Sequence, residues 1–278
     1  GIDKGRTHYM DLPHLRENEE SSNKWLKEVY DLKKWLETIV KRPITQKDIF
    51  RGIGAYMDAF KVFSKLIEMR RQQQIPSVHF AVITNALPYD NIEHWTACTN
   101  KYILSKPQRK EDSIPIFLAG SPVIFPNVKL LTLIERVSMR VAADDICSME
   151  RVFPGPPCYE DRSKYALMRA LADRYHKACI CPTFADNERR LNGIVNVLET
   201  GTIKGVIFHV LKGCHPYDME SVIMENKLKG LGYRFLKIET DYVKEDEQNI
   251  LTRLEAFRQT LKEQGRNIIS SSEQSQTN

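Results

Sequence analysis

The stretch at residues 205–242, GVIFHVLKGCHPYDMESVIMENKLKGLGYRFLKIETDY, constrains the fold more than any other part of this 278-residue chain. Its first apolar run, residues 206–211, is followed by Gly213 and Cys214, and a second apolar run covers residues 233–238. Between the runs, apolar residues recur at helical spacing at Met219, Val222 and Ile223. The pattern predicts a strand–loop–helix–strand unit, and the right-handed crossover rule makes its two strands parallel.

The region upstream repeats this alternation of strand and helix. Apolar runs at 114–118 and 139–143 predict two further strands, and an insertion with helices near 163–178 and 186–200 separates them from the pair described above. A final helix follows the last strand. Alternating elements of this kind predict a doubly wound parallel α/β sheet over residues 113–264.

A helical hairpin is expected before the sheet, over residues 21–72. Ser21 or Ser22 could cap its first helix, and Thr45 followed by Asp48 resembles a capping box at the start of its second. Apolar residues spaced three and four apart form a seam along both helices. The seam indicates core packing first and a partner-subunit surface second.

The remaining segments complete the predicted organisation. Residues 1–20 read as an extended connection, 21–112 as a helical middle region and 265–278 as a polar, disordered tail. Within the middle region SVHFAVIT, at 77–84, suggests a short strand. The chain starts at Gly1 rather than at a methionine, so we expect a preceding N-terminal domain.

Composition narrows the function classes. The net charge of +5 is spread along the chain, which argues against a nucleic-acid partner, and no run of 18 apolar residues predicts a membrane span. Six irregularly spaced cysteines indicate reduced thiols and a cytoplasmic protein without a disulfide framework.

Strand polarity brings four strand ends to one edge of the predicted sheet, where ligands of open parallel sheets bind. The candidate positions are Gly120-Ser121, Asp144-Asp145 with Cys147, Cys214-His215 and Glu239 with Asp241. Each has an ordinary structural alternative. Cys214 could be a buried thiol and His215 a solvated loop residue. The two aspartates could cap the next helix. Gly120-Ser121 could either form an ordinary tight turn or admit a phosphate or thioester oxygen to its backbone N–H groups.

Several common sites are missing from the sequence. It contains no C-x-x-C pair, and the C-x-C at Cys179 and Cys181 does not have the usual spacing for zinc or iron–sulfur ligands. It has neither a G-x-x-x-x-G-K-[ST] nor a G-x-S-x-G motif, so ATP hydrolysis and serine hydrolase chemistry are not expected of it.

The segments IPIFLAGSPVIFPNVKLLTLIERVSMRVAADDIC, RYHKACICP, residues 205–242 and ILTRLEAF together resemble the 2-hydroxyacyl-CoA dehydratase and benzoyl-CoA reductase family. The resemblance spans about residues 9–262, and the motif HVLKG-x-x-x-YD favours the benzoyl-CoA reductase branch. It implies Rossmann-like or flavodoxin-like domains in two related subunits that form a heterodimer. An ATP-hydrolysing activator then supplies low-potential electrons.

The same resemblance implies a 4Fe–4S cluster held by three cysteines per subunit, of which the third matches Cys214. The other two are expected in the N-terminal domain that this chain does not contain, and Cys147 is a second possible metal ligand. Gly213 and His215 would tune the cluster or handle a proton, with His215 as the catalytic candidate, while Gly120 and Ser121 would bind substrate.

Two functions follow from the resemblance, and the expected lack of the first domain supports a third. The first is single-electron reduction of an aromatic acyl-CoA, and the second is dehydration of a (R)-2-hydroxyacyl-CoA through a ketyl radical. The third is a cluster-free scaffold subunit without catalysis.

Overall fold

The computed structural model describes residues 7–15, 18–107, 113–177, 181–183 and 188–274, with the side chains of its last helix placed as far as residue 263. The chain forms two units. The first contains residues 1–61 and 154–190, and the second contains residues 62–153 and 191–278. The insertion expected after the second strand therefore contributes to both units.

The first unit is helical. It contains α1 (Glu19–Val40), the first part of α2 (Gln46–Arg71) and α6 (Lys164–Lys177), and α1 packs along α6. Its core joins apolar residues of all three helices: Trp25, Leu26, Ile49, Ile53, Leu167, Met168 and Ala172. The predicted seam of α1 is buried in this core near Trp25, whereas Leu36 and Ile39 near the end of α1 are exposed.

The starts of α1 and α2 test the predicted caps. Asn18, and not Ser21 or Ser22, caps α1, because its side-chain oxygen accepts the Glu20 N–H at 2.7 Å. The capping box before α2 is confirmed: the Asp48 carboxylate accepts the Thr45 N–H at 2.9 Å, and the Thr45 hydroxyl accepts the Asp48 N–H at 3.2 Å.

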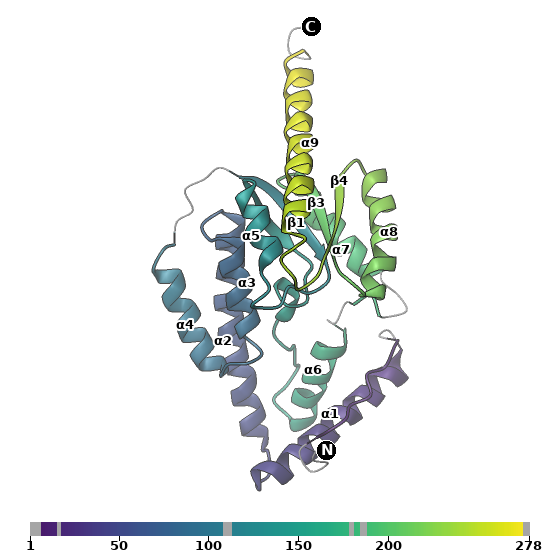
Figure 1. Ribbon diagram of the computed structural model, residues 1–278. Helices are drawn as coiled ribbons and strands as arrows, with labels where there is room; N and C mark the ends of the chain where they lie inside the picture. The colour runs from purple at the N-terminus through teal and green to yellow at the C-terminus, as the bar shows by residue number, and fades with distance from the viewer. Residues whose placement is uncertain (1–6, 16–17, 108–112, 178–180, 184–187, 275–278) are drawn as a thin grey trace. The chain divides into compact units, whose positions relative to one another are not determined.

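The second unit is built on a four-stranded sheet. Its strands are β1 (Ile114–Gly120), β2 (Met139–Asp144), β3 (Gly205–Leu211) and β4 (Arg234–Thr240), in the order β2-β1-β3-β4. Every neighbouring pair is parallel. All four strands were predicted to within two residues at each end, and the α/β class with a parallel sheet is confirmed (Figure 1).

Helices cover both faces of the sheet. The strand order reverses direction after β2, so right-handed crossovers place α5 (Lys129–Arg136) and α8 (His215–Gly230) on opposite faces. α5 packs against α9 (Glu247–Gln274), while α7 (Glu188–Leu198) and α8 bury apolar side chains against the alternate residues of β3, Val206, Phe208 and Val210. Residue 265 onward, predicted as a tail, continues α9 as far as Gln274.

Two further helices precede the sheet in the second unit, α3 (Ser77–Ala86) and α4 (Ile92–Leu104). The strand suggested for SVHFAVIT is wrong, because this segment is α3. Its buried residues Ser77, Phe80, Ala81 and Thr84 recur at helical spacing. Packing against β2 and α5 therefore overrides the β preference of its valines and isoleucine.

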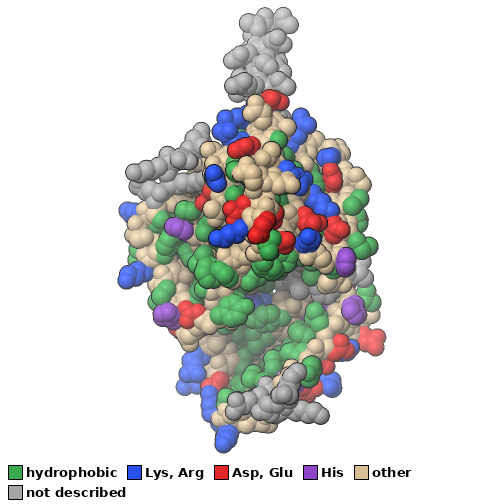
Figure 2. Space-filling model, in the orientation of Figure 1, with side chains coloured by type: hydrophobic (Ala, Val, Ile, Leu, Met, Phe, Trp, Pro, Cys, Tyr) green, Lys and Arg blue, Asp and Glu red, His purple; other side chains and the backbone are tan. Residues whose placement is uncertain are grey.

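Over the part of the chain that the structure describes, no helix is long and apolar enough to cross a membrane. Basic and acidic side chains are interspersed on the face drawn in Figure 2, so the net charge of +5 is not concentrated there.

The end of β1 depends on the absence of a side chain at Gly120. Its φ of +107° is a conformation that favours glycine, and a Cβ built there would lie 2.0 Å from the His209 carbonyl oxygen. We expect Gly120→Ala to lower the free energy of unfolding by at least about 2 kcal/mol, since backbone strain and overlap add. Urea denaturation measures this change.

The matched control is Gly193→Ala, in the middle of α7, where an added Cβ meets nothing within 4 Å. There we expect a gain of up to about 1 kcal/mol from helix propensity. Equal effects at the two positions would contradict the close approach of β1 to β3.

Candidate functional site at the carboxyl edge of the sheet

One buried imidazole joins three strand ends at the carboxyl edge. His209 of β3 is 4% exposed, and its Nδ1 lies 3.0 Å from the Ser121 carbonyl oxygen, just after β1. Its Nε2 lies 2.7 Å from the Thr240 hydroxyl at the end of β4. A carbonyl only accepts, so Nδ1 carries the proton and Nε2 accepts from Thr240. Burial lowers the pKa of His209 to about 4, so the ring is neutral.

The predicted substrate residues Gly120 and Ser121 lie at this junction. Ser121 is fully buried; its N–H donates to the His209 carbonyl at 2.8 Å, and its hydroxyl accepts the Leu211 N–H at 3.0 Å. These contacts hold the end of β1 against β3. The substrate role of the two residues stays a prediction, and the Ser121 N–H and hydroxyl are already engaged within the sheet.

Cys214 lies in the tight turn that joins β3 to α8. Its N–H donates to the Leu211 carbonyl at 2.8 Å, which closes a four-residue turn, and Gly213 takes a φ of +84° at the third position. The thiol is partly exposed, packs against the core cluster and immediately precedes α8, while His215 is exposed. The turn thus places the partly exposed Cys214 at the carboxyl edge.

The acid at the end of β2 is part of a buried ion cluster. Arg70 of α2 pairs with Asp144 and with Glu150 in the short 3-10 helix η2 (Glu150–Val152). The second Asp144 oxygen accepts the N–H groups of Ile146 at 2.8 Å and Glu150 at 3.1 Å. The capping alternative thus describes Asp144 better than a metal site does.

The same cluster shifts a carboxyl pKa. The pKa of Glu150 is raised to about 7. Burial is the main cause and the Asp144 charge adds to it, while Arg70 opposes both.

A second arginine connects the loop after β2 to α8. The Arg151 side chain lies 3.0 Å from the Asp145 carboxylate and donates at 2.9 Å to the hydroxyl of Tyr217, a buried residue in the first turn of α8. Burial alone would lower the pKa of Arg151, but Asp145, Tyr217 and Cys147 together raise it above its usual value. Arg151 thus fixes the loop that carries the exposed Cys147 relative to the helix that follows Cys214.

The loop after β4 is held in a similar way. Lys129, the first residue of α5, donates to the carbonyls of Asp241 at 3.1 Å and Val243 at 2.6 Å, and it pairs with Asp246. The Asp241 carboxylate accepts the Val243 N–H at 2.8 Å. Asp241, expected at the carboxyl edge, therefore shapes its own loop.

Two cavities at or near this edge lie within the second unit. A pocket of about 570 Å³ is bounded by the loop after β1, the first turns of α5 and residues 242–247. A narrow cleft beside it reaches His209, Leu211 and Thr240.

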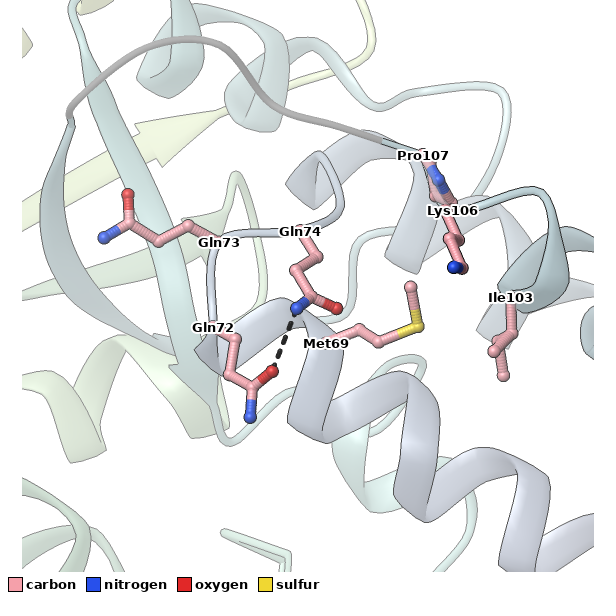
Figure 3. Close-up of a pocket in the computed structure, with 7 residues that line it drawn as sticks. All are labelled: Met69, Gln72, Gln73, Gln74, Ile103, Lys106 and Pro107. Carbon is pink, nitrogen blue, oxygen red and sulfur yellow. Dashed lines mark hydrogen bonds between the residues drawn. The ribbon is translucent and has the colours of Figure 1, made fainter.

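A third cavity, of about 540 Å³, lies at the ends of α2 and α4 (Figure 3). Its lining mixes polar and apolar side chains and includes none of the predicted site residues. It consists of Met69, Gln72, Gln73, Gln74, Ile103, Lys106 and Pro107. Gln74 donates to Gln72 at 3.0 Å within it. This cavity is therefore separate from the candidate site.

The resemblance to cluster-carrying enzymes calls for a test of the ligands. Among the residues that the structure describes, no group of three or more His, Cys, Asp or Glu could hold a metal ion. Cys214 and Cys147 each follow the end of a strand. Cys179 lies outside the described residues. The described part of the chain therefore does not fit a complete iron–sulfur cluster.

Sequence reasoning missed His209, Arg70 and Arg151. The first was hidden in an apolar run as an ordinary strand residue, although a histidine amid FHVL is itself a signal for a buried polar contact. The two arginines gave no local signal, because Arg70 is 74 residues from Asp144 and Arg151 is 66 residues from Tyr217.

Comparison with known proteins gives one family and several relatives. The model of the family "2-hydroxyglutaryl-CoA dehydratase, D-component" matches residues 2–261. The chain is 24% identical over 273 residues to the β subunit of (R)-2-hydroxyglutaryl-CoA dehydratase from Acidaminococcus fermentans, covering 93% of this chain and 69% of that protein.

Two other relatives are also named as dehydratase subunits. The (R)-phenyllactyl-CoA dehydratase β subunit of Clostridium sporogenes is 24% identical over 87% of this chain and 65% of its own length. A provisionally named dehydratase subunit of Escherichia coli K12, YjiM, is 32% identical over 55% of this chain and 39% of its own length. The chain thus spans about two fifths to two thirds of the length of these relatives.

The Arg151–Tyr217 contact can be tested without a ligand. We expect Tyr217→Phe to lower the free energy of unfolding by about 1–3 kcal/mol, because a buried guanidinium loses an acceptor while the aromatic ring keeps its place beside Phe208. Urea denaturation gives the difference.

The matched control is Tyr233→Phe, since Tyr233 also packs against the core but has no hydroxyl partner among the described residues. It should change the free energy of unfolding by less than about 0.5 kcal/mol. A Tyr217→Phe variant as stable as this control would contradict a stabilising hydrogen bond between Arg151 and the Tyr217 hydroxyl.

Proposed function

Because the chain belongs to the 2-hydroxyglutaryl-CoA dehydratase D-component family, we propose that it is a subunit of an enzyme that dehydrates a (R)-2-hydroxyacyl-CoA. The observation that carries this proposal is the family match over residues 2–261. The relatives named above are dehydratase subunits, which favours dehydration over the reduction of an aromatic acyl-CoA that the HVLKG-x-x-x-YD wording suggested.

The proposal includes partners. Two relatives are named as β subunits, which supports assembly of this chain with a second, related subunit. An ATP-hydrolysing activator belongs to the same proposal, because the resemblance implies one and this sequence has no G-x-x-x-x-G-K-[ST] motif. A cytoplasmic location fits the exposed thiols Cys98, Cys147 and Cys158, which stay reduced in such a compartment.

Cys214 is the residue of this chain proposed to bind the 4Fe–4S cluster. Cys214 is partly exposed at the carboxyl edge and directly precedes α8, and a cysteine sulfur is the usual protein ligand of such clusters. Apart from Cys147, the other ligands would come from outside the described residues. When bound, the cluster supplies the low-potential electron that amino-acid side chains cannot.

The neighbouring residues keep their predicted roles as proposals. His215 is exposed beside the thiol and would donate a proton or a hydrogen bond there, and Gly213 provides the positive φ that the turn requires. Gly120 and Ser121 would act on substrate through the shape of the edge, because the Ser121 hydroxyl and N–H are already bonded to β3. Cys147 is held by its loop near Arg151 and remains a possible second ligand.

The test uses the full-length gene product, purified anaerobically with the subunit that accompanies it and supplied with iron and sulfide. We expect broad visible absorbance from a cluster, and Cys214→Ser should remove most of it together with the bound iron. The loss of activity should exceed the 10–100-fold typical of residues around a metal site. Cys98→Ser, at an exposed position of α4, is the control and should keep both.

Activity is then measured with the reduced activator and two substrates, 2-hydroxyglutaryl-CoA and benzoyl-CoA. Formation of the enoyl-CoA from the first supports the proposal, whereas turnover of benzoyl-CoA alone would replace it with ring reduction. A full-length protein that binds no iron, or a Cys214→Ser variant with an unchanged cluster, would contradict the role of Cys214.

A further inference from the structure

The pocket beside the carboxyl edge has the size and the position of a ligand site. Its volume of about 570 Å³ falls in the range of 300–1,000 Å³ that is typical of small-molecule sites. It is lined by the loop after β1, the first turns of α5 and the loop after β4, all in the second unit. Open parallel sheets bind ligands outside this same edge.

The walls of the pocket are tied together before any ligand enters. The Lys129 ammonium group donates to two carbonyls of the loop after β4, those of Asp241 and Val243, and pairs with Asp246. Asn127, from the loop after β1, adds a contact at 3.4 Å to the Asp241 carbonyl. The two loops are therefore fixed relative to each other, which lowers the entropy cost of binding.

The lining exposes large apolar side chains. Phe125 is 59% exposed and Tyr242 is 67% exposed, on opposite loops, and Ile124 and Val243 are also exposed. Apolar side chains gathered around a concave surface are typical of a binding site, whereas single ones on a convex surface are not.

The charges around the pocket balance. Lys129 is neutralised by Asp246. The rim carries one positive residue, Lys244, and one negative residue, Glu247. No excess positive charge is therefore available to select a phosphate. Asn127 and the exposed Thr132 supply polar groups beside the apolar walls. This combination suits a neutral chain with apolar segments and a few amide groups.

A narrow cleft next to the pocket reaches the strand-end junction at His209. The cleft shares Ile124, Asn127, Lys129 and Tyr242 with the pocket, and it reaches His209 and Thr240. The Thr240 carbonyl accepts the N–H of Lys212, two residues before Cys214, at 2.8 Å.

We propose that this pocket binds the acyl-pantetheine arm of the CoA thioester and that the nucleotide part stays outside it. This assignment rests on the proposed function, which makes a CoA thioester the substrate. Pantetheine has the required chemistry, because it is an uncharged chain of apolar segments joined by two amides.

The test fills the pocket from an exposed position. Thr132 lines it on α5, and its hydroxyl bonds to the Val128 carbonyl four residues earlier. Thr252 on α9 is matched to it: it is exposed, makes the same kind of bond to the Gln248 carbonyl, and does not line this pocket.

Thr132→Trp and Thr252→Trp are compared in the full chain with its copurifying subunit. The probes are butyryl-pantetheine, adenosine 3′,5′-bisphosphate and butyryl-CoA, followed by ligand-detected NMR.

We expect Thr132→Trp to raise the Kd of butyryl-pantetheine at least about tenfold and to leave that of the bisphosphate unchanged, while Thr252→Trp behaves as wild type. A rise for the bisphosphate instead would overturn the pantetheine assignment. Equal binding of butyryl-CoA by wild type and Thr132→Trp would overturn the pocket and leave the proposed function intact. No binding of butyryl-CoA by wild type would count against both.

Discussion

The neutral imidazole of His209 holds the carboxyl ends of three neighbouring strands at fixed positions. It donates to the backbone after β1 and accepts from the hydroxyl at the end of β4, so β1, β3 and β4 cannot slide without leaving a buried nitrogen unpaired. Gly120 reinforces this junction, because only a residue without a side chain lets β1 approach the His209 carbonyl so closely. Register at this edge is thus set by polar contacts as well as by the apolar faces of the strands.

The loops that follow the strands are fixed by charged groups of the same unit. Arg70 holds Asp144 at the end of β2, Arg151 connects Asp145 to Tyr217 in α8, and Lys129 holds the loop after β4. Because each cation is largely buried and has several acceptors, breaking one pair would leave an uncompensated charge, which is expensive. The turn with Cys214 and the pocket beside it therefore lie on a preorganised edge rather than on loosely held loops.

The sequence predicted much of this fold. The four strands are apolar runs followed by glycine or acidic residues, and parallel order follows from the helices between them. It mistook α3 for a strand, since β-branched residues there favour a strand locally and only packing against β2 decides otherwise. It also placed the cap of α1 at a serine, three or four residues after Asn18, because several capping residues stand close together.

The candidate site was less accessible to sequence reasoning. Strand polarity brought Cys214, Cys147, Gly120 and the acids to one edge, but it could not say which of them are engaged by the protein itself. Asp144 and Ser121 are engaged by partners distant in sequence, whereas Cys214 stays partly exposed. Lys129 shapes the pocket, but the sequence showed it only as a residue of a predicted helix. Its three acceptors lie in the loop after β4, more than a hundred residues away.

The protonation of His209 tests most directly whether the three strand ends are joined as described. The folded-state pKa is lowered below the ordinary 6.5, so the unfolded chain binds more protons between about pH 6.5 and 4. The stability that this group contributes is therefore complete above pH 6.5 and is lost as the pH falls toward 4. In a ¹⁵N-labelled histidine NMR titration, we expect His209 to remain neutral with its proton on Nδ1 down to near pH 4. An imidazole that titrates near pH 6.5, or that carries its proton on Nε2, would contradict the account.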